Sequence, residues 1–133
     1  MRKCHLTVEG TYWLAGLVPL PISCEFSFHP EDPYAVTLIF DAEDEPPVRW
    51  VFARELLTEG LTAKAGEGDV TVWPEHEHAT GPDRGSDMWS GRHSKVWVEV
   101  GDTRHRALFE IPAAPVAQWL ASTYALVPLV AAD

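Results

Sequence analysis

The sequence predicts an α+β protein in which groups of antiparallel strands are each followed by a helix. Apolar and polar residues alternate with a period of two in several short segments, which is typical of half-buried strands. Two other segments have helical character instead, and each comes after a group of strands. Strands grouped ahead of a helix favour antiparallel sheets over repeated strand–helix–strand units.

A single domain over residues 1–133 is expected, because 133 residues fall within the usual range of about 100–200 per domain. Hydrophobic residues make up 46% of the chain and charged residues 23%, which excludes disordered and fibrous classes. Asp and Glu number 20 against 10 Lys and Arg, so the net charge is −10. This balance opposes binding to a nucleic-acid backbone or to anionic lipid.

The amino-terminal segment loosely mimics an export signal, because Arg2 and Lys3 precede a partly apolar stretch. Glu9 and Gly10 interrupt that stretch early. The uncharged run over residues 10–24 contains two prolines and is shorter than the roughly 20 residues of a membrane-spanning helix. We therefore expect a strand segment of a cytoplasmic protein, with no transmembrane segment.

Strands in the first half are expected over residues 24–28, 34–40 and 48–52. One face of the second strand would hold Tyr34, Val36, Leu38 and Phe40. Asp32 and Pro33 would begin this strand, since proline is tolerated at a strand's first position. Trp50 and Phe52, aligned with Val48, would fill a core face of the third strand. The acidic segment 41–47 ends in two prolines and predicts a solvated hairpin loop.

Residues 53–59 lack strand alternation and consist of good helix formers, which predicts a helix of about two turns. Gly60 would end this helix as a left-handed residue. A tight turn is expected next, at Gly66, Gly68 and Asp69. Another strand would follow over residues 70–73.

The polar, irregular segment over residues 75–94 predicts a mobile loop. Strands are then expected over residues 95–100 and 104–109. Gly101 and Asp102 between them are typical of a two-residue hairpin turn of the II′ kind.

Pro112 and Pro115 suit the first turn of a helix that continues through Tyr124. The predicted elements therefore form two halves, about 4–60 and about 68–124. Each half has strands first and a helix last, which looks like a structural repeat without evident sequence identity.

Metal and redox chemistry have weak support. His76 and His78, with His93, could ligate a metal, but no thiolate or rigid scaffold supports them, so a solvated loop is favoured and no metal or cofactor is expected. Cys4 and Cys24 are expected to be buried thiols, and their pairing stays open. Motifs for a catalytic nucleophile or a nucleotide-binding loop are absent from the sequence.

Tryptophan is abundant, with six residues, most of them in strand or helix patterns that suggest core positions. Trp97 and Trp73 each stand opposite a valine face and would point to the other side, at a subunit interface or under a helix. Trp89, in the loop, is a candidate for partner binding. Arg54 and Glu55 at a helix start could pair with strand-end groups or form a docking face.

Several ordered motifs make the chain resemble the SsgA-like proteins, in the SsgB-type or a related branch. They lie at residues 32–36, 50–61, 66–70, 73–74 and 122–128. These proteins are sporulation and cell-division regulators of filamentous actinobacteria. We interpret the residues of these motifs as mostly structural. They are Asp32, Pro33, Tyr34, Trp50, Phe52, Gly60, Gly66, Gly68 and Asp69. The loop over residues 75–94 is longer than the family's usual loop, and segment 10–21 matches poorly.

The resemblance implies a whirly-like fold with two strands-then-helix repeats, antiparallel sheets forming a barrel-like core, and a trimer. It also implies a non-enzymatic regulator at the division septum that contacts itself, other SsgA-like proteins and FtsZ. Whirly proteins bind single-stranded nucleic acid, which is the alternative function. The acidic balance opposes that alternative, and no nucleic-acid partner is expected.

Overall fold

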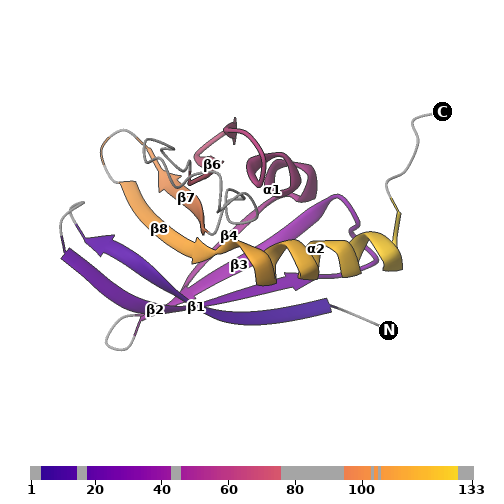
Figure 1. The fold of residues 1–133 in the computed structure, drawn as a ribbon, viewed down its shortest axis with the longest axis horizontal. Coiled ribbons are helices and arrows are strands. Elements are labelled where there is room, and N and C mark those ends of the chain that lie inside the picture. Colours follow the sequence, from indigo (N-terminus) through magenta and orange to yellow (C-terminus); the bar gives the residue numbers. More distant parts are fainter. Residues whose placement is uncertain are drawn as a thin grey trace, which may run out of the picture.

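Strands and helices follow one another in the order four strands then a helix, twice over, in the computed structural model (Figure 1). The structure describes residues 4–14, 18–42, 46–75, 95–102, 104 and 106–128. The first group comprises β1 (Cys4–Leu14), β2 (Val18–Phe28), β3 (Ala35–Asp41), β4 (Val48–Ala53) and α1 (Arg54–Gly60). The second comprises β5 (Ala65–Glu67), β6 (Val70–Pro74), β7 (Lys95–Gly101), β8 (Arg106–Pro112) and α2 (Ala113–Leu126).

All eight described strands form one antiparallel sheet in the order β4-β3-β2-β1-β8-β7-β6-β5. The two groups of strands are therefore two meanders that meet where β1 pairs with β8. Helix α1 contacts β3 and β4 at one end of this order and β5 and β6 at the other. The sheet is thus a nearly closed barrel, with α1 across the gap, which confirms the predicted α+β class and antiparallel pairing.

The interior is filled by the residues of one face of the alternating strands. Phe40 on β3 and Phe109 on β8 stack with ring centroids 3.6 Å apart, although β2 and β1 separate their strands in the sheet. This contact reaches across the inside of the curled sheet. Trp119 of α2 packs on Phe26, at a centroid distance of 5.4 Å, so α2 covers the same interior. Among the described residues, no helix is long and apolar enough to cross a membrane.

Two expectations about the first half need correction. Tyr34 does not share the buried face of β3, because it precedes the strand in a turn and is 67% exposed. In β4 only Phe52 is buried, whereas Val48 is 50% exposed and Trp50 is half-buried. The reason is that β4 is the last strand of the sheet order and has a neighbour on one side only.

Gly60 is the last residue of α1 and has no left-handed conformation, so its predicted capping role is wrong. Its role is close packing. A Cβ atom at this position would overlap the fully buried side chain of Val72 on β6. Gly60 thereby lets α1 lie directly against the second meander.

We expect Gly60→Ala to lower the free energy of unfolding by about 1–3 kcal/mol, because the methyl group overpacks the α1–β6 contact. Alanine has a better helix propensity than glycine, by about 1 kcal/mol. The sign of the change in unfolding free energy therefore shows whether packing or helix propensity dominates. Urea unfolding measures the change, and Glu59→Ala in the exposed part of the same helix is the control. A stabilised Gly60→Ala variant would contradict the packing role.

The turn between β5 and β6 is shorter than predicted. Gly66 lies within β5, and the turn consists of Gly68 and Asp69 between the paired residues Glu67 and Val70. Gly68 has φ +62°, a conformation that glycine adopts without steric cost. The carbonyl of Asp69 accepts a hydrogen bond from Gly101 N at 3.0 Å, which joins this turn to the end of β7.

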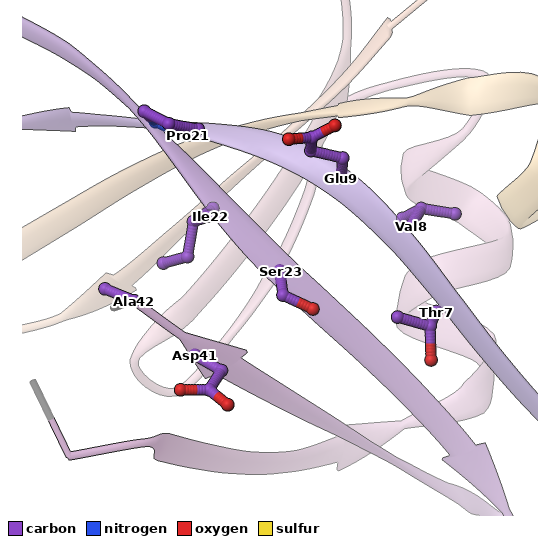
Figure 2. A pocket seen from close by; sticks show the side chains of 8 residues that line it. All are labelled: Thr7, Val8, Glu9, Pro21, Ile22, Ser23, Asp41 and Ala42. Atoms are coloured by element: carbon purple, nitrogen blue, oxygen red, sulfur yellow. The ribbon is translucent and has the colours of Figure 1, made fainter. Parts of the chain in front are cut away.

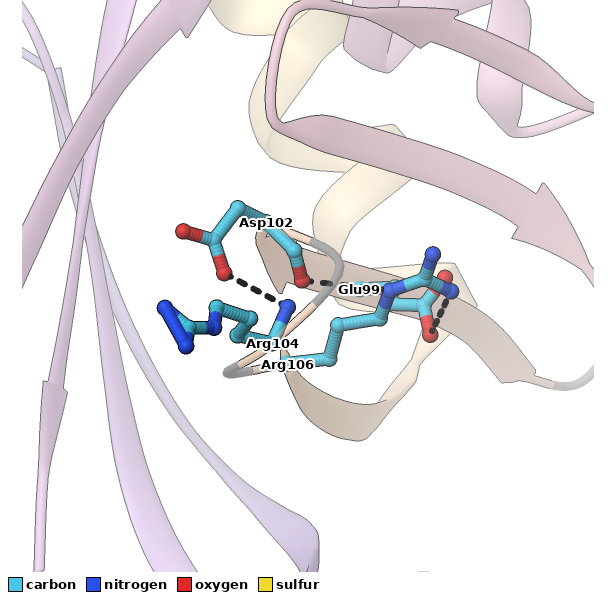
Figure 3. Close-up of polar contacts among 4 residues, drawn as sticks. All are labelled: Glu99, Asp102, Arg104 and Arg106. Carbon is cyan, nitrogen blue, oxygen red and sulfur yellow. Dashed lines mark hydrogen bonds and ion pairs between the residues drawn. The ribbon is translucent and has the colours of Figure 1, made fainter.

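The β7–β8 connection is longer than the predicted two-residue turn, because Gly101 still pairs with Arg106. Asp102 organises the connection (Figure 3). Its Oδ1 accepts a hydrogen bond from Arg104 N at 2.9 Å, and its carbonyl accepts one from Arg106 Nε at 3.3 Å. Arg106 also lies 3.6 Å from a carboxylate oxygen of Glu99. A side-chain bond to the backbone two residues ahead is a turn in itself, which explains the extra length.

Cys4 and Cys24 are both free thiols. Cys4 pairs with Phe28 and Cys24 with Val8, so the two cysteines stand four positions apart along the hairpin. Cys24 is fully buried, and burial raises the pKa of its thiol to about 12 from the ordinary 9.0.

This shift predicts that stability falls in alkali. Above pH 9 the unfolded thiol loses its proton while the native thiol keeps it until the pH approaches 12. The unfolded state therefore binds fewer protons, and we expect a loss of about 1.4 kcal/mol by about pH 10. Urea unfolding of the wild type and of Cys24→Ala at pH values below and above 9 measures it. Equal alkaline losses in the two proteins would contradict this assignment.

Candidate protein-interaction surface

Three tryptophans lie together on the outer side of the barrel wall, and we call this surface the tryptophan face. It comprises Trp13 on β1, Trp97 on β7 and Trp73 on β6, with Glu110, Lys95 and Lys64 around them. Strand alternation causes the outward direction, since the neighbours of Trp97, Val96 and Val98, are fully buried inside. Each of the three tryptophans is partly exposed.

Their rings form a connected row. Trp73 and Trp97 are direct cross-strand partners whose ring centroids lie 6.4 Å apart with planes within 12°. Trp13 lies 6.5 Å from Trp97 at an interplanar angle of 39°. Trp97 is therefore the centre of the row and contacts both other rings.

Charged groups border the row and orient its rings. Trp13 Nε1 donates a hydrogen bond to Glu110 Oε1 at 3.1 Å, and Lys95 Nζ lies 3.5 Å from the other oxygen of that carboxylate. Lys64 Nζ lies 5.3 Å from the ring centroid of Trp73. An aromatic centre with a polar border is the composition of protein interfaces, where tryptophan often carries much of the binding energy.

Arg54 is buried between the two helices and does not form an exposed docking face. It is 3% exposed, and its Nη1 donates to the carbonyl oxygen of Thr123 at 3.1 Å, near the end of α2. Its guanidinium carbon lies 3.9 Å from the ring centroid of Tyr124 and 4.8 Å from that of Phe28. The positive group thus sits at the negative end of α2, which stabilises the helix. The guanidinium is unavailable to an outside partner, and only Glu55 beside it is exposed.

A second bond joins the two helices beside Arg54. Thr58 Oγ1 and the Tyr124 hydroxyl lie 2.7 Å apart. The motif segments 50–61 and 122–128 therefore meet in space, and together they fix α2 on the first meander.

The remaining predicted site residues are placed as follows. Trp89, His76, His78 and His93 lie outside the described residues, as does nearly all of the predicted loop 75–94. In the described part of the chain, no group of three or more His, Cys, Asp or Glu residues is arranged to hold a metal. Trp13 and Glu110 were missed, although the alternation of β8 could have placed Glu110 outside.

Together, the fold and this surface define a small α+β barrel protein with a tryptophan-rich outer face. The family model "Streptomyces sporulation and cell division protein, SsgA" matches residues 22–131, and the chain belongs to this family. The Thermobifida fusca protein "Sporulation-specific cell division protein SsgB" is 34% identical over 110 residues, which are 83% of this chain and 70% of that protein. The protein of the same name from Streptomyces coelicolor is 37% identical over 109 residues, 82% of this chain and 70% of that protein.

Solved structures agree with the sequence comparison. The crystal structure of an SsgA-like sporulation-specific cell division protein from Thermobifida fusca superposes with a TM-score of 0.79 at 31% identity, covering 96% of this chain and 83% of that one. A second structure, described with SsgB mutations that correlate to longitudinal cell division during sporulation of Streptomyces coelicolor, has a TM-score of 0.76 at 31% identity. It covers 96% of this chain and 90% of that one.

Proposed function

We propose that this chain is a non-enzymatic scaffold of sporulation-specific cell division that acts through protein contacts. Its family and its relatives named SsgB supply the cellular process. The observation that supports protein contact is the tryptophan face, where three indoles turn outward instead of filling the core. Its role is to help place the septum or remodel the wall there, in the cytoplasm at the division site.

The tryptophan face is proposed as the surface through which copies of the chain associate, as a trimer. Partly exposed tryptophans gain most when a partner removes them from water, because each large ring buries much apolar area. Light scattering at micromolar concentration should give three times the 14.8 kDa of one chain. A strict monomer would overturn the proposal of self-association.

FtsZ and other SsgA-like proteins are the proposed further partners. Co-sedimentation with FtsZ polymers tests the first, and the protein should pellet only when polymers are present. If the same amount of protein pellets with and without polymers, FtsZ is excluded as a partner, and the proposal of self-association is not affected.

Nucleic acid is a less suitable partner for the same surface. Lys95 lies 3.5 Å from Glu110 and Arg106 lies 3.6 Å from Glu99, so carboxylates offset these cations, and the whole chain carries a net charge of −10. Single-strand binding requires a positive groove beside the stacking rings. Retention of single-stranded DNA or RNA on a filter at low salt would favour this alternative instead.

A further inference from the structure

The β1–β2 hairpin extends beyond the strand that neighbours it. All of β2 pairs with β1, from Val18 to Phe28, whereas β3 pairs only with Ser23–Ser27. Among the described residues, no strand pairs with segment 18–22 of β2 on the side where β3 would continue, and we call this side the free edge.

Two prolines determine which backbone hydrogen-bonding groups this edge presents. Pairing with β1 continues without a break through Pro19, opposite Trp13, and Pro21, opposite Thr11. Since proline has no N–H, these pairs cannot exchange hydrogen bonds, and the alternate residues Leu20 and Ile22 must do so. The backbone of both prolines then faces away from β1. The free edge presents carbonyl oxygens at these positions and lacks the matching donors.

Two adjoining hollows lie along this part of the hairpin. They measure about 640 and 400 Å³ and share Glu9 and Pro21 in their linings. We call them together the hairpin groove, and Figure 2 shows the side chains that line the larger hollow. Ser23 pairs with Glu9 on one side and Asp41 on the other, so these three residues form one row across β1, β2 and β3.

The charges of the groove have no compensation within the described chain. Glu9 and Asp41 are both exposed, and neither forms an ion pair with a described cation. Together with the proline carbonyls and the Ser23 hydroxyl, they make a surface rich in hydrogen-bond acceptors and negative charge. A metal ion fits poorly, because no group of three or more His, Cys, Asp or Glu among the described residues could ligate one.

We propose that the hairpin groove binds an extended, arginine-rich segment of a partner protein. A guanidinium group has five donors and no acceptor, which complements carboxylates and carbonyls that lack donors of their own. The missing N–H groups disfavour an ordinary added strand, so side chains rather than backbone provide the recognition. This site adjoins the tryptophan face, since Pro19 pairs with Trp13 and Thr11 with Glu110, but none of the three tryptophans lines the groove.

The probe is a fluorescein-labelled hexa-arginine peptide, followed by anisotropy at low salt. The test variant combines Glu9→Gln with Asp41→Asn. Its matched control combines Glu55→Gln with Glu67→Gln, which removes the same charge from exposed carboxylates elsewhere. We expect the test variant to bind about tenfold more weakly and the control to change by less than about twofold, since charge-assisted hydrogen bonds exceed long-range attraction. No binding, or equal weakening of both variants, would overturn the proposal.

Two further measurements locate the peptide and distinguish this proposal from self-association. Amide chemical shifts should change at residues 7–9, 22 and 23 when the peptide is added, and changes confined to other residues would contradict the site. Light scattering of the test variant should give the wild-type mass. A lower mass would mean that a second copy of the chain occupies the groove, which would overturn the assignment to a basic partner while supporting self-association.

Discussion

Replacing Arg54 with alanine is expected to lower the free energy of unfolding by about 3 kcal/mol, one of the two largest effects predicted for this protein. The substitution removes the donor of the Thr123 carbonyl and the cation above the Tyr124 ring. It also leaves a cavity beneath α2, because the Arg54 side chain is buried. Urea unfolding followed by tryptophan fluorescence measures the change.

Arg54→Lys separates charge from shape. Lysine keeps the positive charge near the end of α2 but lacks the planar group that stacks on Tyr124 and Phe28. The loss of unfolding free energy for Arg54→Lys should fall between zero and the loss for Arg54→Ala. A change below about 0.5 kcal/mol for Arg54→Ala, the size typical of surface substitutions, would show that Arg54 does not hold the helix.

The second large effect is expected for Trp97→Ala, which should convert the proposed trimer into monomers. Trp97 contacts both other rings of the tryptophan face, so its loss disrupts the centre of the row. Truncating a tryptophan at the centre of an interface typically costs about 2 kcal/mol or more of binding free energy. Light scattering over a dilution series gives the mass, and circular dichroism shows whether the strands persist.

Tyr34→Ala is the matched control for this experiment. Tyr34 is an aromatic residue with 67% exposure that is not among the contacts of the tryptophan face. Its removal should leave the mass unchanged. Wild-type mass for a folded Trp97→Ala protein would place the self-contact elsewhere.

Local patterns predicted the strands whose residues alternate without interruption. The alternation in β3, β7 and β8 survives because each of these strands has one buried and one outer face. The beginning of β2 was not recognised, since prolines are usually excluded from strands that pair on both sides. Pro19 and Pro21 are tolerated here because β3 does not reach them.

Tertiary contacts decided the features that sequence patterns missed. Gly60 follows helix formers and suggests a left-handed cap, but its small size serves the contact with Val72, a residue 12 positions ahead on β6. Arginine usually lies at the surface, so the sequence suggests that Arg54 is exposed. Its burial depends on contacts with the end of α2, 69 residues away. The tryptophan face was predicted only in part, because Trp13 joins it through pairing between the first and last strands.

The septal role is tested most directly by where the protein lies in sporulating hyphae. A fluorescent fusion of the wild type should form regularly spaced bands at future septa, and the Trp97→Ala fusion should be diffuse at equal abundance. Wild-type fluorescence along the lateral wall or throughout the cytoplasm, with no bands at septa, would contradict a scaffold that acts at the division site through protein contacts.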